Sequence, residues 1–183
     1  MNKKLATALV ALTLSAAANA ALDVGEKAPD FNAPAALAGQ QFKFSLSESL
    51  AKGPVVLYFF PAAFSVGCSA EEHEFAENIG KFEALGASVI GVSTDDIDTQ
   101  VKFSMQACQG KFPVASDAGK SVVQSYDAAM MILPDFANRI SYVIAPDQSI
   151  AYAYQSLNPS KHVENTLTAL REWGIANQGR KPK

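Results

Sequence analysis

Residues 55–75 read VVLYFFPAAFSVGCSAEEHEF, an apolar run that ends at a proline and is followed by a cysteine at the start of a helical pattern. The run from Val55 to Phe60 is aliphatic, β-branched and aromatic, which is typical of a strand buried on both faces of a sheet. Pro61 ends it because proline cannot donate a hydrogen bond inside a sheet. The stretch therefore predicts a buried strand, a short loop and a helix.

The residues after this loop have helical periodicity. Apolar side chains recur at spacings of four, three and three residues, at Phe75, Ile79, Phe82 and Leu85. Charged side chains fall between them, at Glu72, Glu74, Glu77 and Lys81. A helix with one apolar stripe is therefore expected to pack on the sheet, with Cys68 at its entrance.

Two N-terminal boundaries fit this helix. Ser65 as N-cap places Cys68 in the first turn, whereas Ser69 with Glu72 forms a capping box and leaves Cys68 just outside. In both cases the thiol lies near unpaired backbone N–H groups and the positive end of the helix dipole, which favours the reactive thiolate. On these grounds alone, a buried structural cysteine explains Cys68 as well as a reactive one does.

The first twenty residues predict a secretory signal peptide. Lys3 and Lys4 form a short positive region, Leu5 to Ala17 an apolar stretch, and Ala18-Asn19-Ala20 a small-x-small cleavage site. The apolar stretch is too short to span a bilayer, and no second segment of spanning length follows. We expect cleavage after Ala20 and a soluble protein in the bacterial periplasm or outside the cell.

Loss of this segment from the 183 residues would leave 163 and change the formal charge from −3 to −5, because Lys3 and Lys4 leave with it. That length suits one domain, expected over residues 21–177 and followed by a polar tail at 178–183. A mildly acidic chain without a basic stripe argues against nucleic acid or an anionic membrane as partner. The two cysteines of an exported protein can also be a plain disulfide.

The rest of the chain alternates strands and helices. Short edge strands are expected at Val24–Phe31 and Phe42–Leu46, and further strands at Ala87–Ser93 and Phe112–Ala115. After a cap at Asp95-Asp96, a helix is expected with the apolar stripe Ile97, Val101, Met105 and Cys108. A short helix at 120–126, a hairpin of Arg139–Ile144 with Ser149–Tyr154, and a closing helix at Pro159–Trp173 complete the series. The order predicts an α/β fold with a mixed sheet.

The motif Pro61-x-x-x-Ser65-x-x-Cys68 resembles the P-x-x-x-(T/S)-x-x-C signature of peroxiredoxins. Later blocks are similar in order and spacing to the bacterioferritin comigratory protein branch of that family, namely Gly91–Asp95, Phe112–Asp117, Arg139–Ile144 and Pro146-Asp147. The resemblance runs from about Val24 to Trp173. It implies a thioredoxin-like fold with a short N-terminal β extension, and a thiol peroxidase that needs no cofactor.

The same resemblance implies roles for individual residues. Cys68 would be the nucleophile that becomes a sulfenic acid, and the Ser65 hydroxyl would position the peroxide. Pro61 would shield the site. Arg139 would favour the thiolate and bind peroxide oxygens, and Glu71 would help to order the helix and the arginine.

Many members of this branch carry their resolving cysteine five residues after the nucleophile, where this chain has His73. That leaves Cys108 as the internal candidate, and its disulfide with Cys68 would require two helices to fray. We expect a thioredoxin-like reductant to recycle the enzyme, which would be a monomer or a homodimer. A one-Cys peroxidase resolved by an external thiol, and a non-enzymatic domain with a structural Cys68–Cys108 disulfide, stay open.

Other functions of a thioredoxin-like fold are less well supported. The sequence after Cys68 has neither the C-x-x-C pair of thiol–disulfide reductases nor the C-x-x-x-C pair of copper-delivery proteins. His73 and His162 are too few and too far apart to predict a metal site, and both are expected on the surface.

Overall fold

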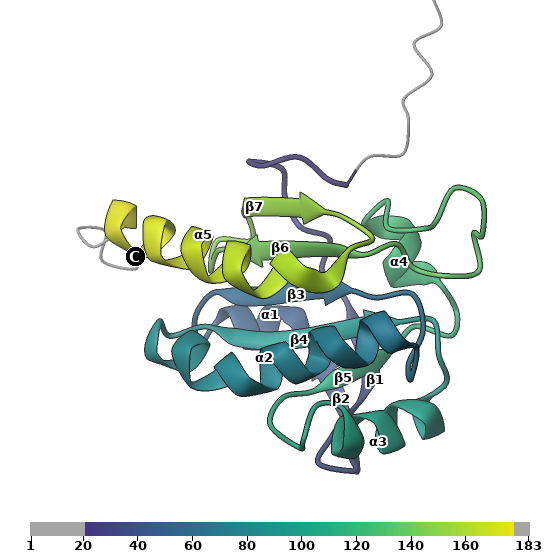
Figure 1. Ribbon diagram of the computed structural model, residues 1–183. Coiled ribbons are helices and arrows are strands. Elements are labelled where there is room, and N and C mark those ends of the chain that lie inside the picture. The colour runs from purple at the N-terminus through teal and green to yellow at the C-terminus, as the bar shows by residue number, and fades with distance from the viewer. Residues whose placement is uncertain (1–20, 178–183) are drawn as a thin grey trace, which may run out of the picture.

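The computed structural model describes residues 21–177 (Figure 1), so the expected signal peptide at 1–20 and tail at 178–183 lie outside the described residues. Its elements are β1 (Asn32–Leu37), β2 (Gln40–Ser45), α1 (Leu46–Leu50), β3 (Val55–Phe59), α2 (Val66–Ala84), β4 (Ser88–Ser93), α3 (Ile97–Gln106), β5 (Val114–Ser116), α4 (Ser121–Ser125), β6 (Ile140–Ile144), β7 (Ile150–Gln155), the 3₁₀ turn η1 (Pro159–Lys161) and α5 (His162–Asn177).

One seven-stranded mixed sheet runs through the molecule in the order β2-β1-β5-β4-β3-β6-β7. Strand β3 lies inside the sheet, where it pairs in parallel with the central strand β4 and antiparallel with β6. Helices α2 and α5 lie side by side on one face of the sheet, with α3 beyond them, and α1 lies behind it (Figure 1). The predicted α/β class with a mixed sheet is therefore confirmed.

The apolar run from Val55 to Phe60 supplies strand β3, which is buried inside this sheet. All five residues of β3 are buried, and successive side chains enter opposite cores, as the two-residue period of a strand requires. Leu57 and Phe59 belong to the core on the α1 side. Val56 and Tyr58 belong to the core under α2, α3 and α5.

The expected strand at Val24–Phe31 is wrong. This segment makes only an isolated bridge between Lys27 and Ser149, and the N-terminal hairpin lies further along the chain, as β1 and β2. The segment cannot pair continuously because Gly25 turns the backbone at φ +94° and Pro29 has no N–H to donate.

The apolar stripe expected on α3 is also wrong, since Met105 is 60% exposed. The buried face of α3 carries Gln100, Phe103 and Ser104. The Gln100 amide nitrogen donates to Ser93 Oγ at 2.7 Å and Ser104 Oγ accepts from the Gly39 N–H at 3.0 Å, whereas Gln100 Oε1 has no hydrogen-bond partner. Cys108 is buried as expected, but it lies two residues past the helix end.

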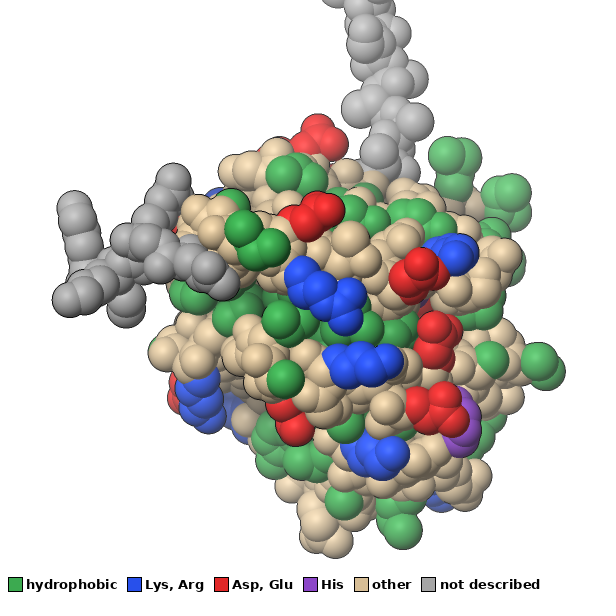
Figure 2. Space-filling view, turned by 60° about the vertical axis from the view of Figure 1, so that its left-hand side comes forward, with side chains coloured by type: hydrophobic (Ala, Val, Ile, Leu, Met, Phe, Trp, Pro, Cys, Tyr) green, Lys and Arg blue, Asp and Glu red, His purple; other side chains and the backbone are tan. Residues whose placement is uncertain are grey.

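The surface in Figure 2 shows acidic and basic side chains interspersed, with no large patch of one sign on this face. Within residues 21–177, no helix has the length and apolar character needed to cross a membrane.

Candidate active site

Helix α2 begins immediately after the loop that follows β3. Ser65 is its N-cap residue, so Cys68 lies in the first turn. The alternative start at a Ser69–Glu72 capping box is wrong, because the Ser69 N–H already donates to the Ser65 carbonyl at 2.9 Å. The Ser65 hydroxyl does not cap the helix; it donates backwards to the Ala62 carbonyl at 3.0 Å. The first turn is therefore held without a side-chain cap.

The loop before α2 is held by a residue that the sequence did not single out for this role. The Ala63 N–H donates to Asp95 Oδ2 at 2.7 Å, and the Ser93 hydroxyl donates to the same oxygen at 2.6 Å. Phe64 adopts φ +61°, a left-handed conformation that is uncommon for a bulky residue. Asp95, at the end of β4, thus fixes the loop that carries Ser65.

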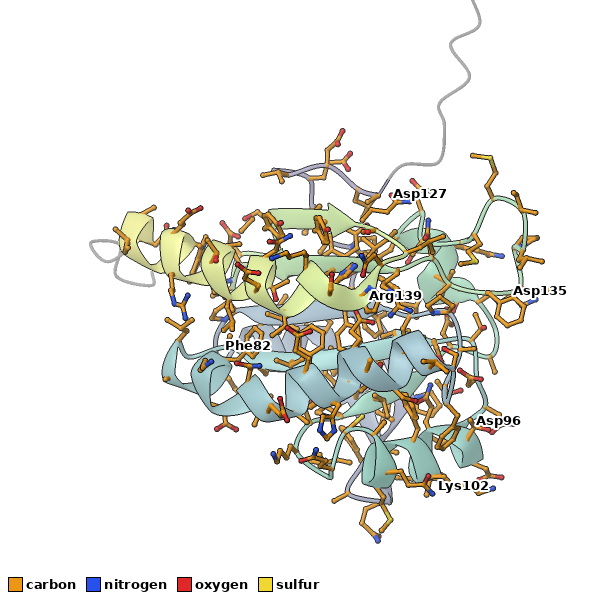
Figure 3. The ribbon with its side chains drawn as sticks, viewed as in Figure 1. Phe82, Asp96, Lys102, Asp127, Asp135 and Arg139 are labelled. Carbon is orange, nitrogen blue, oxygen red and sulfur yellow. The ribbon has the colours of Figure 1, made fainter. Side chains whose placement is uncertain are left out.

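Cys68 is brought together with Arg139, which lies 71 residues further along the chain. Arg139 immediately precedes β6, the neighbour of β3, and its side chain points into the gap between α2 and the start of α5 (Figure 3). Its Nη2 donates to Cys68 Sγ at 3.2 Å, and the two residues are 4% and 0% exposed. The guanidinium thus gives the sulfur a buried, charge-assisted hydrogen bond.

The guanidinium is fixed on its other edges. Its Nη1 donates a hydrogen bond to Glu71 Oε2, and its Nε donates to the Leu157 carbonyl at 3.2 Å. Burial raises the pKa of Glu71 to about 8, although the guanidinium opposes this rise. Glu71 therefore lies beside Arg139 and one helical turn from Cys68, as the resemblance implied.

His162 was expected on the surface, and this expectation is wrong: the residue is fully buried. Its Nε2 donates to the Ser156 carbonyl at 2.9 Å, which leaves Nδ1 to accept from the Ser141 hydroxyl at 2.8 Å. Nδ1 lies 3.6 Å from Glu71 Oε1. Burial lowers the pKa of His162 to about 4, so the ring is neutral at pH 7. The neutral imidazole therefore lies next to the Glu71 carboxyl that contacts Arg139.

The remaining predicted residues are Pro61, Cys108 and His73. Pro61 is half-buried directly after Phe60, while Cys108 is fully buried in the same core as Cys68, and both thiols are free. His73 is exposed and contacts Glu77. No group of three His, Cys, Asp or Glu side chains suited to a metal ion occurs within residues 21–177.

A family model described as the AhpC/TSA family matches residues 24–153. The chain belongs to this family, the peroxiredoxins. It is 32% identical over 129 residues to a putative chloroplastic peroxiredoxin Q of Oryza sativa subsp. indica, a match that covers 69% of this chain and 59% of the rice protein. A putative peroxiredoxin of Mycobacterium tuberculosis is also 32% identical over 129 residues, which is 83% of its length.

Solved peroxiredoxins share the fold. The peroxidoxin BcpB from Mycobacterium tuberculosis is 30% identical, with a TM-score of 0.73 over 81% of this chain and 96% of that one. A mutant of PrxQ from Xylella fastidiosa is 26% identical, with a TM-score of 0.75 over 85% of this chain and 99% of that one. The expected thioredoxin-like fold is therefore confirmed for this peroxiredoxin.

Proposed function

We propose that this peroxiredoxin reduces hydrogen peroxide or organic hydroperoxides with Cys68 as its nucleophile. The observation that carries the proposal is the buried hydrogen bond from Arg139 to Cys68 Sγ at 3.2 Å. In the reaction, the thiolate sulfur attacks one peroxide oxygen and the O–O bond breaks. Cys68 becomes a sulfenic acid, and the other oxygen takes up a proton and leaves as water or an alcohol.

The neighbouring residues divide the other requirements of this displacement. Arg139 stabilises the thiolate and the negative charge that develops on the leaving oxygen, and Glu71 holds the guanidinium in place. Ser65 is exposed at the mouth of the loop, where rotation of its hydroxyl away from the Ala62 carbonyl would let it contact a bound peroxide. Pro61 limits the approach of water from the end of β3.

We further propose that Cys108 resolves the sulfenic acid and that a thioredoxin-like donor reduces the resulting disulfide. Both cysteines face the same core, on the α2, α3 and α5 side of the sheet. A disulfide requires the two Cα atoms to lie about 4.4–6.8 Å apart, so the first turn of α2 would open to deliver Cys68. The missing side-chain cap at Ser65 makes that opening easier.

Reaction of the reduced protein with one equivalent of hydrogen peroxide tests these steps. We expect loss of both thiols within seconds and a Cys68–Cys108 link in the peptide map. A sulfenic or sulfinic Cys68 with Cys108 intact would identify a one-Cys enzyme resolved by an external thiol. The absence of a fast reaction would instead favour a scaffold domain. Full turnover of Cys108→Ser with a thioredoxin would exclude the internal disulfide as an obligatory step.

Export to the periplasm remains part of the proposal, and its support is the sequence of residues 1–20. Expression of the full chain in a Gram-negative host, followed by osmotic shock and N-terminal sequencing, tests it. The expected product is released by the shock and begins at Ala21. Sedimentation of this product, expected as a monomer or homodimer, gives the oligomeric state.

A further inference from the structure

A second buried acid, Glu72, lies on α2 four residues after Cys68, is hydrogen-bonded to Tyr58 in the core that holds both cysteines, and has no part in the reaction described so far. Its side chain is fully buried one residue after Glu71. Oε1 accepts a hydrogen bond from the Tyr58 hydroxyl at 3.1 Å, and Oε2 has no hydrogen-bond partner. A buried carboxyl oxygen without a partner is costly, so its presence suggests a use.

The partner of Glu72 is held rigidly. The Tyr58 ring stacks on Phe75 with a centroid distance of 4.3 Å and an interplanar angle of 16°. On the neighbouring strand, Gly91 is paired with Tyr58, and a Cβ atom at Gly91 would lie 2.6 Å from the Tyr58 hydroxyl oxygen. A side chain at position 91 would displace the Tyr58 hydroxyl. Glycine at this position of β4 therefore leaves room for the Tyr58–Glu72 hydrogen bond.

The charged and titratable groups around Glu72 include both thiols. Burial raises the pKa of Glu72 well above its usual range, and Glu71 and Cys68 raise it further. Burial also raises the pKa of Cys108, and Glu72 is the neighbour that adds to the effect. Burial thus favours the protonated form of the Glu72 carboxyl, which interacts electrostatically with both Cys68 and Cys108. Because burial favours the thiol form of Cys108, this thiol has to lose its proton as it attacks.

We propose that Glu72 is the proton relay for the step in which Cys108 resolves the Cys68 sulfenic acid. The inference rests on the proposed function, since it requires Cys108 to be the resolving residue. In this step the S–O bond of Cys68 breaks as the S–S bond forms. The leaving hydroxyl takes the proton of the Glu72 carboxyl and departs as water, and the Cys108 thiol proton restores the neutral acid. No reactant beyond the sulfenic acid and the thiol is consumed.

Glu72→Gln is the direct test, because glutamine keeps the shape and can still accept from Tyr58 but cannot transfer a proton. The two rates are measured in single turnovers with one equivalent of hydrogen peroxide, by rapid quench, thiol labelling and mass spectrometry. We expect the ratio of the disulfide-forming rate to the sulfenic-acid-forming rate to fall about 10- to 100-fold, as for loss of general acid–base catalysis. The longer-lived sulfenic acid should also yield more sulfinic acid when peroxide is in excess.

Glu77→Gln is the matched control, because it makes the same chemical change at an exposed position of the same helix. Its rate ratio should equal that of the wild type. An unchanged ratio in Glu72→Gln, with the Cys68–Cys108 link formed normally, would overturn the relay and leave the proposed function intact. Failure of the wild type to form this link would overturn both.

A measurement on the wild type alone covers the case in which Glu72→Gln does not fold. Because the relay moves protons as the disulfide forms, the disulfide-forming rate should fall in D₂O. The two solvents are compared at the same acidity, after correction of the pH-meter reading in D₂O. Equal disulfide-forming rates in H₂O and D₂O would overturn the relay.

Discussion

Arg139 uses each of its three nitrogens differently: one contacts Cys68, one pairs with Glu71, and one donates to the Leu157 carbonyl. A lysine keeps the charge but has a single nitrogen, which cannot reach all three partners. We therefore expect the function of Arg139 to depend on the shape of its guanidinium as well as on its charge.

We expect Arg139→Lys to lower the rate of sulfenic acid formation about 10- to 100-fold, because the thiolate and the leaving oxygen lose a fixed donor. Stopped-flow peroxide consumption measures this rate. Arg171→Lys, at an exposed position of α5, is the control and should retain the wild-type rate. Wild-type kinetics in Arg139→Lys would show that charge alone is sufficient.

His162 is neutral in the folded protein, and its pKa of about 4 lies below the 6.5 of an unfolded chain. A group with a depressed folded pKa contributes stability above pH 6.5 that is lost as the pH falls towards 4. We expect His162→Gln to reduce the loss of unfolding free energy between pH 7 and pH 4 by roughly 2–3 kcal/mol. Urea unfolding at the two pH values measures the change. A reduction just as large in His73→Gln, at an exposed position, would contradict this assignment.

Sequence reasoning predicted the positions of Cys68, Arg139 and Glu71 because a family motif links residues that are distant along the chain. It missed His162 and Glu72, since nothing in the sequence distinguishes a buried ionisable residue from a solvated one at a polar position of a helix. Only the three-dimensional arrangement reveals their partners, Ser141 for the imidazole and Tyr58 for the carboxyl. A weak signal existed for Glu72, in its place directly after Glu71 beside the apolar stripe.

At the scale of elements, the proposed disulfide requires a first turn of α2 that holds Cys68 against Arg139 in the reduced protein and opens after oxidation. It has no side-chain cap, and its second residue is Gly67. A Cβ atom at Gly67 would lie 3.4 Å from Arg139 Nη2, an ordinary contact distance. Alanine therefore fits at this position.

We expect Gly67→Ala to stabilise this turn by about 1 kcal/mol through helix propensity and to slow disulfide formation up to about 5-fold. Gly80→Ala is the matched control: it adds the same propensity in the middle of α2, where a Cβ atom would meet nothing within 4 Å. Both variants should raise the melting temperature, and only Gly67→Ala should slow the disulfide step. Equal disulfide rates in the two would show that the turn does not need to open.

Elements were predicted well where one physical signal dominates. The apolar run of β3 and the Gly and Pro boundaries around it left one interpretation, and the observed strand ends within a residue of the expected one. The periodicity of α3 was misleading because Gln100 and Ser104 are buried through hydrogen bonds to Ser93 and Gly39, which lie far away in sequence. A stripe of apolar letters cannot reveal polar residues that are satisfied by tertiary contacts.

At the scale of the whole molecule, two buried carboxyl groups and one buried imidazole act on stability in opposite directions. Burial raises the pKa of Glu71 from 4.5 to about 8, and it raises that of Glu72 as well. A carboxyl with a raised folded pKa binds protons more tightly in the folded state, so stability falls as the pH rises between the two values. Above pH 6.5, the loss is not offset by His162.

We therefore expect the unfolding free energy of the reduced protein to fall as the pH rises from 6.5 to 8.5. Glu72→Gln should flatten this slope, because it removes one of the two carboxyls that are forced to ionise in the core. Denaturant unfolding at constant ionic strength measures both slopes. A steeper slope in the variant would contradict the expected sign.

The complete burial of both sulfurs has a consequence for how the reduced protein meets reagents of different size. We expect hydrogen peroxide to reach the buried Cys68 through a smaller structural fluctuation than a bulky aromatic disulfide requires. The ratio of the Cys68 reaction rates with these two reagents would then measure how strongly burial of the sulfur excludes the larger one.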